Sequence, residues 1–264
     1  MLNKILSYTP SAKFNSRFLN LFGVSFLPYF IFSIFNINKK YKTKKFNNLY
    51  NKKINPNDVS KLDEDGYLLI NNFLDEKDYF DLLNQIDNYK IKSESNNLND
   101  LSIPIMTFKK NIIKSEILDK YFGPKSIIYS LITSVTGIKS ELNPPIEYRQ
   151  IQNTEERKTS YSDNQHLLHF DVNYQSYKAI LYLNDTDEKN GAFKIIPKSH
   201  KVTVKRLKKE YVYSISNKID KIDNLYEKEK KNLISLEAKK NSLIIMNAKS
   251  IHCRGTFEKK GIRK

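Results

Sequence analysis

The sequence predicts an α+β chain whose second half is an antiparallel β-sandwich or barrel. Apolar residues recur at helical spacing up to about residue 136, alternate with polar residues after Pro144 and Pro145, and form no internal repeat. At 264 residues the chain fits one large domain or two small ones. It is long enough to bury a substantial core without disulfides.

The first half reads as a strand followed by helices. We expect a polar turn ending at Gly66, a short buried strand over 67–70, and a helix that Asp75 can cap. Four apolar residues of that helix share one face, namely Tyr79, Leu82, Leu83 and Ile86. After a polar loop at 92–100, a further helical region over 114–136 should break near Gly123 and Pro124.

The second half reads as strands joined by turns. Strands are expected over 177–184 and 192–197, joined as a hairpin by the turn residues 185–191, and again over 241–248. Between them, residues 202–240 form a Lys-rich excursion with an expected helix near 218–232. Before them, Tyr148, Gln150 and Gln152 should share one face of a strand.

Residues 1–60 differ in composition from residues 61–264, which predicts a separate N-terminal segment. The apolar, aromatic stretch 21–37 is followed directly by the lysine-rich stretch 39–45. Three interpretations stay open: a helix packed on the main domain, an anchor at a membrane surface, and a membrane span. The single cysteine, Cys253, allows no intrachain disulfide and favours a cytoplasmic setting, with the peripheral membrane as an alternative.

The net charge of +16 is unevenly distributed. Residues 1–60 and 201–264 are strongly basic, whereas the middle of the chain is weakly acidic. Only six of the 45 basic residues are Arg, the residue that base and phosphate readers favour. We therefore expect no specific nucleic-acid binding, and only weak membrane-surface association through residues 21–45. The sequence does not indicate an oligomeric state.

A candidate metal site involves two of the four histidines. His169 stands two residues before Asp171, and His252 follows the expected strand at 241–248. A mononuclear Fe(II) oxygenase needs two imidazoles and one carboxylate, with open positions left for a 2-oxo acid and dioxygen. Arg263 lies eleven residues after His252. A guanidinium is the natural bidentate clamp for the far carboxylate of 2-oxoglutarate.

Three stretches of the chain resemble the phytanoyl-CoA dioxygenase family of Fe(II)/2-oxoglutarate oxygenases. They are "DGYLLINNFL" (65–74), "HFDVNYQSYKAILYLNDTDEKNGAFKIIPKSHK" (169–201) and "IHCRGTFEKKGIR" (251–263). The resemblance implies a double-stranded β-helix (jelly-roll) core with flanking N-terminal helices. It also implies iron on His169, Asp171 and His252, with the cosubstrate 2-oxoglutarate on Arg263 and Gln152. Lys178 matches a common family lysine, and we place it with the cosubstrate residues without a particular role.

The same resemblance implies O2 as second cosubstrate and hydroxylation of a small-molecule or lipid-like substrate. Related halogenases lack the carboxylate that Asp171 provides, so its presence favours hydroxylation. Plausible substrate-wall residues are Asn173, Tyr174 and Tyr177. The chain departs from the family pattern at Lys198, where glycine is usual. It departs again after Lys264, where we expect the family's last core strand to be missing.

Two further hypotheses belong to other classes of protein. One is a catalytically inactive jelly-roll binding protein, and the other is a membrane-surface protein that acts through residues 1–60. Of the remaining histidines, His200 is expected to be structural and His166 to lie outside the site.

Overall fold

The computed structural model describes residues 54–88 and much of 100–263. Not described within that range are residues 105, 108–109, 112–114, 124–125, 137–146, 154–163, 172–175, 202, 207–208, 210–225 and 257–260. The apolar stretch 21–37 and the lysine-rich stretch 39–45 lie outside the described residues, so their interpretations stay predictions. Among the residues described, no helix is long and apolar enough to cross a membrane.

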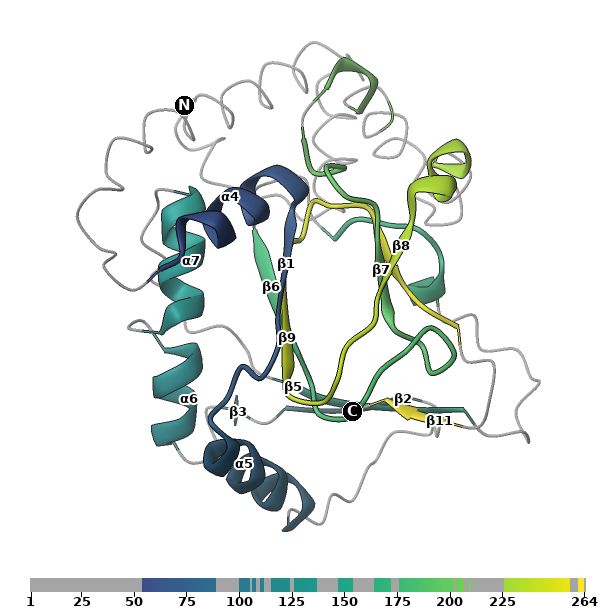
Figure 1. Cartoon of the computed structure of the whole chain (residues 1–264). Coiled ribbons are helices and arrows are strands. Elements are labelled where there is room, and N and C mark those ends of the chain that lie inside the picture. The colour runs from purple at the N-terminus through teal and green to yellow at the C-terminus, as the bar shows by residue number, and fades with distance from the viewer. Residues whose placement is uncertain are drawn as a thin grey trace, which may run out of the picture.

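Two antiparallel sheets face each other in the centre of the molecule (Figure 1). The first has the order β1 (Tyr67–Ile70), β9 (Ser242–Asn247), β6 (Tyr177–Tyr182). The second has the order β10 (His252–Arg254), β7 (Phe193–Ile195), β8 (Ile234–Leu236). Apolar side chains from both sheets form the cluster between them, which we call the inner core: Tyr182, Phe193, Ile195, Leu236, Ile244 and Met246.

Helices cover the other face of the first sheet, with α4 (Pro56–Asp65) and α7 (Ile127–Thr136) lying along it (Figure 1). Their cluster, the outer core, contains Leu62, Leu68, Ile128, Leu131, Val135, Leu243 and Ile245. Successive strand residues point to opposite faces, so Ile244 enters the inner core and Ile245 the outer core. Because β9 is buried on both faces, its sequence is a continuous apolar run rather than an alternation.

Helix α5 (Glu76–Asn88) packs with α6 (Ser115–Phe122) at the lower left of Figure 1. As predicted, Tyr79, Leu82 and Ile86 of α5 are buried, and the Tyr79 hydroxyl donates a hydrogen bond to the Leu183 carbonyl at 2.7 Å. The break near Gly123 also agrees with the structure, because α6 ends at Phe122 and α7 begins at Ile127. The strands predicted over 67–70 and 241–248 are confirmed.

Helix α4 is a feature that the sequence patterns missed. Its first turn is capped by the Asn55 side chain, which accepts a hydrogen bond from the Asn57 N–H, and Pro56 occupies the first helical position. Gly66 ends this helix in the left-handed region at φ 81°, where a Cβ would overlap the His200 ring. The predicted polar turn is therefore a helix C-cap, and α4 crosses the predicted segment boundary at residue 60.

The predicted hairpin over 177–197 is wrong. Strand β6 pairs with β9, whereas β7 pairs with β10 and β8 in the facing sheet. Residues 185–191 do form turns, as when Asp187 Oδ1 accepts the backbone N–H groups of Lys189 and Asn190. These local bonds specify a turn, but they do not specify that the chain crosses from one sheet to the other.

A third sheet lies across the lower end of the view in Figure 1, in the order β11 (Gly261–Arg263), β5 (Glu147–Asn153), β2 (Asp100–Pro104). β5 was predicted, whereas β2 and the short pair β3 (Met106–Thr107) and β4 (Lys110–Asn111) were not. Of the helix predicted near 218–232, the described part is a 3-10 helix, η3 (Glu227–Asn232).

Candidate metal centre

The backbone brings the two ligand-bearing segments together. His169 and His252 form an isolated antiparallel bridge, with hydrogen bonds of 2.9 Å from the His169 N–H and 2.8 Å from the His252 N–H to each other's carbonyl. The Asp171 N–H donates to the Ala248 carbonyl at 3.0 Å. Three residues of one segment are thus held against the start of β10, although 83 positions separate the two histidines.

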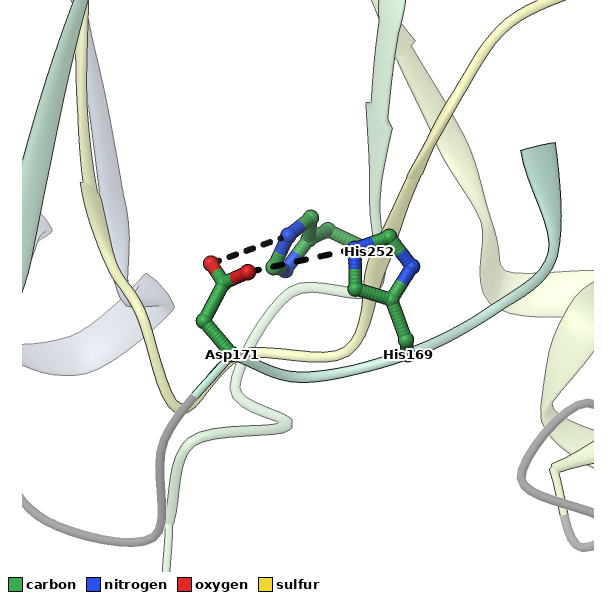
Figure 2. A group of neighbouring side chains, drawn as sticks. All are labelled: His169, Asp171 and His252. Atoms are coloured by element: carbon green, nitrogen blue, oxygen red, sulfur yellow. Dashed lines mark ion pairs between the residues drawn. The ribbon is translucent and has the colours of Figure 1, made fainter. Parts of the chain in front are cut away.

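The three predicted ligand side chains converge on one point (Figure 2). Asp171 Oδ2 lies 3.3 Å from His252 Nε2, and Asp171 Oδ1 lies 3.9 Å from His169 Nε2. One ligand atom from each residue lies within 4.8 Å of the others, so a single metal ion can be shared by all three. Both imidazoles are buried and the carboxylate is partly buried.

Backbone carbonyls set the orientation of both imidazole rings. His169 Nδ1 lies 2.7 Å from the Leu167 carbonyl, and His252 Nδ1 lies 2.8 Å from the Ser250 carbonyl. A carbonyl only accepts, so in each ring the proton sits on Nδ1 and the neutral ring presents the Nε2 lone pair. Both Nε2 atoms face Asp171, which is the arrangement of metal-binding histidines held by an outer hydrogen bond.

The imidazoles of His169 and His252 and the carboxylate of Asp171 are suited to hold a cation. His169 Nε2 is buried and makes no hydrogen bond to the described residues. A buried nitrogen left in this way costs about 1–3 kcal/mol, and a metal ion would satisfy it. Two imidazoles and one carboxylate suit a transition metal with open coordination positions, such as Fe(II).

The charge states at neutral pH also suit metal binding. Burial, reinforced by the nearby His252, lowers the pKa of His169 to about 4, so the ring is neutral. Burial raises the pKa of Asp171, but the interactions with His252 and with the Lys178 ammonium outweigh it and hold that pKa below its ordinary value. Ligands that need no deprotonation bind a metal without competition from protons.

Lys178 contacts the carboxylate of Asp171, an interaction that sequence reasoning did not predict. Its Nζ lies 2.8 Å from Asp171 Oδ2, and its side chain is half exposed. Tyr177, its neighbour on β6, packs against the outer core instead. Strand alternation therefore puts the two side chains on opposite faces of the sheet. Lys178 lies on the side of His169, Asp171 and His252, which we call the triad.

Phe193 of β7 is a second residue that sequence reasoning missed. Its ring stacks on the His252 imidazole, with centroids 5.2 Å apart and planes at 30°. Phe193 and Ile195 alternate with Lys194 and enter the inner core, so the alternation in 192–197 was the available signal. The stacked ring limits the rotation of His252 and excludes water from one of its faces.

Of the predicted cosubstrate residues, Lys178 lies on β6, and Gln152 and Arg263 lie on adjacent strands. Gln152 of β5 pairs with Ile262, and Arg263 of β11 pairs with Ile151. The structure describes these residues through their backbone, so their contacts with 2-oxoglutarate stay predictions. Asn173 and Tyr174 lie outside the described residues.

The other two histidines are separate from the triad cluster. His200 is buried and hydrogen-bonds the Asp63 carbonyl through Nε2 at 3.0 Å, in keeping with its expected structural role. His166 is exposed in the 3-10 helix η2 (Asn164–His166).

The two facing antiparallel sheets carry two imidazoles and one carboxylate that could hold one metal ion. This fold and this set of ligands are typical of β-sheet proteins with a two-histidine, one-carboxylate metal site. The family model of phytanoyl-CoA dioxygenase matches residues 62–256. The chain therefore belongs to the phytanoyl-CoA dioxygenase family, an oxygenase family, as the sequence resemblance predicted. No curated protein sequence matches the chain.

Solved structures resemble the chain in fold at low sequence identity. EctD from S. alaskensis with 2-oxoglutarate and 5-hydroxyectoine is 11% identical, with 81% of this chain and 75% of that chain covered and a TM-score of 0.51. HygX from Streptomyces hygroscopicus with nickel and 2-oxoglutarate bound is 15% identical, with 80% and 84% covered and a TM-score of 0.48. AviO1 from Streptomyces viridochromogenes Tue57 is 10% identical, with 78% and 90% covered and a TM-score of 0.47.

Proposed function

We propose that this chain is an Fe(II)- and 2-oxoglutarate-dependent dioxygenase that hydroxylates a small-molecule or lipid-like substrate. The observation that carries the proposal is the convergence of His169, Asp171 and His252, with ligand atoms within 4.8 Å, in a member of the phytanoyl-CoA dioxygenase family. In this proposal the two facing sheets are the halves of a double-stranded β-helix.

The triad would hold Fe(II) and leave coordination positions for a 2-oxo acid and dioxygen. Bound iron supplies the activation of dioxygen, coupled to conversion of 2-oxoglutarate to succinate and CO2 and to hydroxylation of a C–H bond. Arg263 would clamp the distal carboxylate of 2-oxoglutarate. Gln152 stays a predicted cosubstrate residue, but it pairs with Ile262, so the register puts it on the opposite face of the sheet from Arg263 and does not support a shared contact. The EctD structure contains 2-oxoglutarate, which supports 2-oxoglutarate as the cosubstrate.

Residues around the triad orient the two imidazole rings and exclude water from the site. The Leu167 and Ser250 carbonyls fix both rings, so that each presents Nε2 without reorganisation. His169 and His252 are 4% and 3% exposed, which limits water at the reacting centre. The Phe193 ring packs beside His252 and does the same on that side. Such groups orient and shield chemistry that belongs to the metal and its cosubstrate.

The proposal of hydroxylation rests on Asp171. With iron bound, its carboxylate would take the coordination position that a halide would need, so oxygen transfer is the outcome that the three residues favour. Asn173, Tyr174 and Tyr177 stay predicted substrate-wall residues. Tyr177 is the one that the structure describes, and its packing on the outer core supports a structural role for it instead.

The test is succinate formation by the full chain with Fe(II) and 2-oxoglutarate under air. We expect turnover by the wild type and by His166→Ala, which removes an exposed histidine three residues before the triad. His169→Ala should lose it. Turnover that survives His169→Ala, or a wild type that forms no succinate, contradicts the proposal. A triad shown to be empty by metal analysis of the purified chain would favour the inactive binding protein instead.

A further inference from the structure

Arg206 is a buried cation at the back of the metal centre. Its side chain belongs to a residue only 5% exposed, with Nη1 donating to the Ser199 carbonyl and Nη2 donating to the Lys249 carbonyl, both at 2.8 Å. The guanidinium carbon also lies 4.8 Å from the centroid of the Phe170 ring and 5.5 Å from that of Tyr226. One planar group thus joins four separate segments.

One of these contacts is on the segment that carries His169 and Asp171, and a second is next to the residue to which that segment is hydrogen-bonded. Phe170 stands between the two ligands in sequence, and its side chain enters the cluster of Leu168, Ile251 and Cys253. Lys249 follows Ala248, whose carbonyl accepts the Asp171 N–H.

A third contact acts on the segment that carries His252. Arg206 bonds the carbonyl of Ser199, and the Ser199 hydroxyl oxygen accepts the N–H of Ile251 at 2.8 Å. Ile251 immediately precedes His252. The same guanidinium therefore contacts the neighbour of His169 and Asp171 directly, and it reaches the neighbour of His252 through Ser199. Phe170 and Ile251 alternate with the ligands and share one apolar cluster, on the side of the backbone opposite the metal site.

The chemistry of arginine explains why this residue type stands there. Burying a cation is costly unless hydrogen bonds compensate for its lost hydration. A guanidinium can donate two bonds at a fixed angle and stack its plane on aromatic rings at the same time, which a lysine ammonium cannot. Such an arrangement fixes distances between backbone segments rather than adding only packing.

We propose that Arg206 is a positioning residue that holds the His169–Asp171 segment and the His252 segment at the separation that metal binding requires. It lies in the Lys-rich excursion 202–240, to which the sequence assigned no function. The inference rests on the proposed metal site and adds to it a residue that does not itself bind the metal.

The experiment titrates the metal-free full chain with Co(II), and measures affinity and the visible ligand-field spectrum of the bound ion. R206K keeps the positive charge but loses the pair of guanidinium donors and the planar group that stacks on the rings. We expect Co(II) affinity to fall about 10–100-fold, as for other residues that orient metal ligands. The spectrum should change with it. The control is Lys205→Met, which removes the adjacent cation. The Lys205 side chain is 74% exposed and pairs with Glu229. It should match the wild type.

A merely structural role predicts a different result. R206K would then lower the unfolding temperature while leaving Co(II) affinity and spectrum at wild-type values, and that outcome overturns the proposal. If R206K does not fold, Phe170→Leu decides, because it removes the ring under the guanidinium but keeps an apolar side chain. Weaker Co(II) binding by that variant supports the proposal, and unchanged binding overturns it.

The metal titration distinguishes the proposed metal-dependent function from the role of Arg206. A wild-type chain that binds no Co(II) overturns the proposed metal-dependent function and the role of Arg206 with it. Wild-type binding that R206K reproduces overturns the positioning role alone. Amide exchange in the metal-free chain adds a readout without metal, since R206K should speed exchange at Asp171 and Ile251.

Discussion

The two facing sheets are buried by different means. The central strand of the first sheet, β9, is apolar on both faces, and its residues Leu243, Ile244, Ile245 and Met246 are all 0% exposed. The second carries His252 on its inner side and is braced on its outer side by the buried Arg206. The first sheet is therefore a rigid support, whereas the second positions polar ligands through directional bonds. Substitutions in the first should cost stability, and those in the second should cost metal binding.

The largest effect is expected when a ligand is removed from the second sheet. His252→Ala should weaken Co(II) or Fe(II) binding by at least ~1,000-fold, about 4 kcal/mol, because it leaves two of three ligands. Isothermal titration of the metal-free chain measures this. Retention of near-wild-type affinity would show that His252 is not a ligand.

A substitution in the first sheet should show the opposite pattern. Ile245→Ala, in the outer core and away from the triad, should lower the free energy of unfolding by about 3 kcal/mol through lost burial and a cavity. Urea unfolding with a chelator present measures the loss. Metal affinity of the folded protein should stay at the wild-type value, and a parallel drop would show that the two sheets are not separable in this way.

Lys178 tests how the two sheets are connected, because it extends from β6 of the first sheet to the ligand Asp171. Lys178→Met keeps most of the side-chain length but removes the ammonium, and should weaken metal binding ~10-fold by releasing the carboxylate. Lys178→Arg should retain part of the affinity. Tighter binding by Lys178→Met would reveal instead that repulsion between the ammonium and the metal ion dominates.

The smallest effect is expected at Phe193, which belongs to the inner core and stacks on His252. Phe193→Leu keeps an apolar side chain but removes the ring, so we expect loss of about 1 kcal/mol of stability and a several-fold weaker metal affinity. Paired unfolding and metal titrations separate these two losses. A change in stability alone would assign Phe193 to packing only.

Much of the site could be predicted because its evidence is local or carried by short motifs. His169 and Asp171 lie two residues apart, and the residues around His252 and Arg263 match a family pattern. The contact between Lys178 and Asp171 could not be predicted, because a strand lysine reads as an ordinary solvated charge. Arg206 was hidden for the same reason among the lysines that surround it.

By itself, the sequence determined where the backbone alternates, where helices break, and which three side chains could bind a metal. These features depend on neighbours within a few positions, or on residue types suited to one chemistry. Only the tertiary structure decided that β6 and β7 enter different sheets, that α4 covers the first sheet, and that Arg206 lies behind the ligands. Such pairings depend on which distant surfaces bury each other, and turn or propensity signals carry no information about that choice.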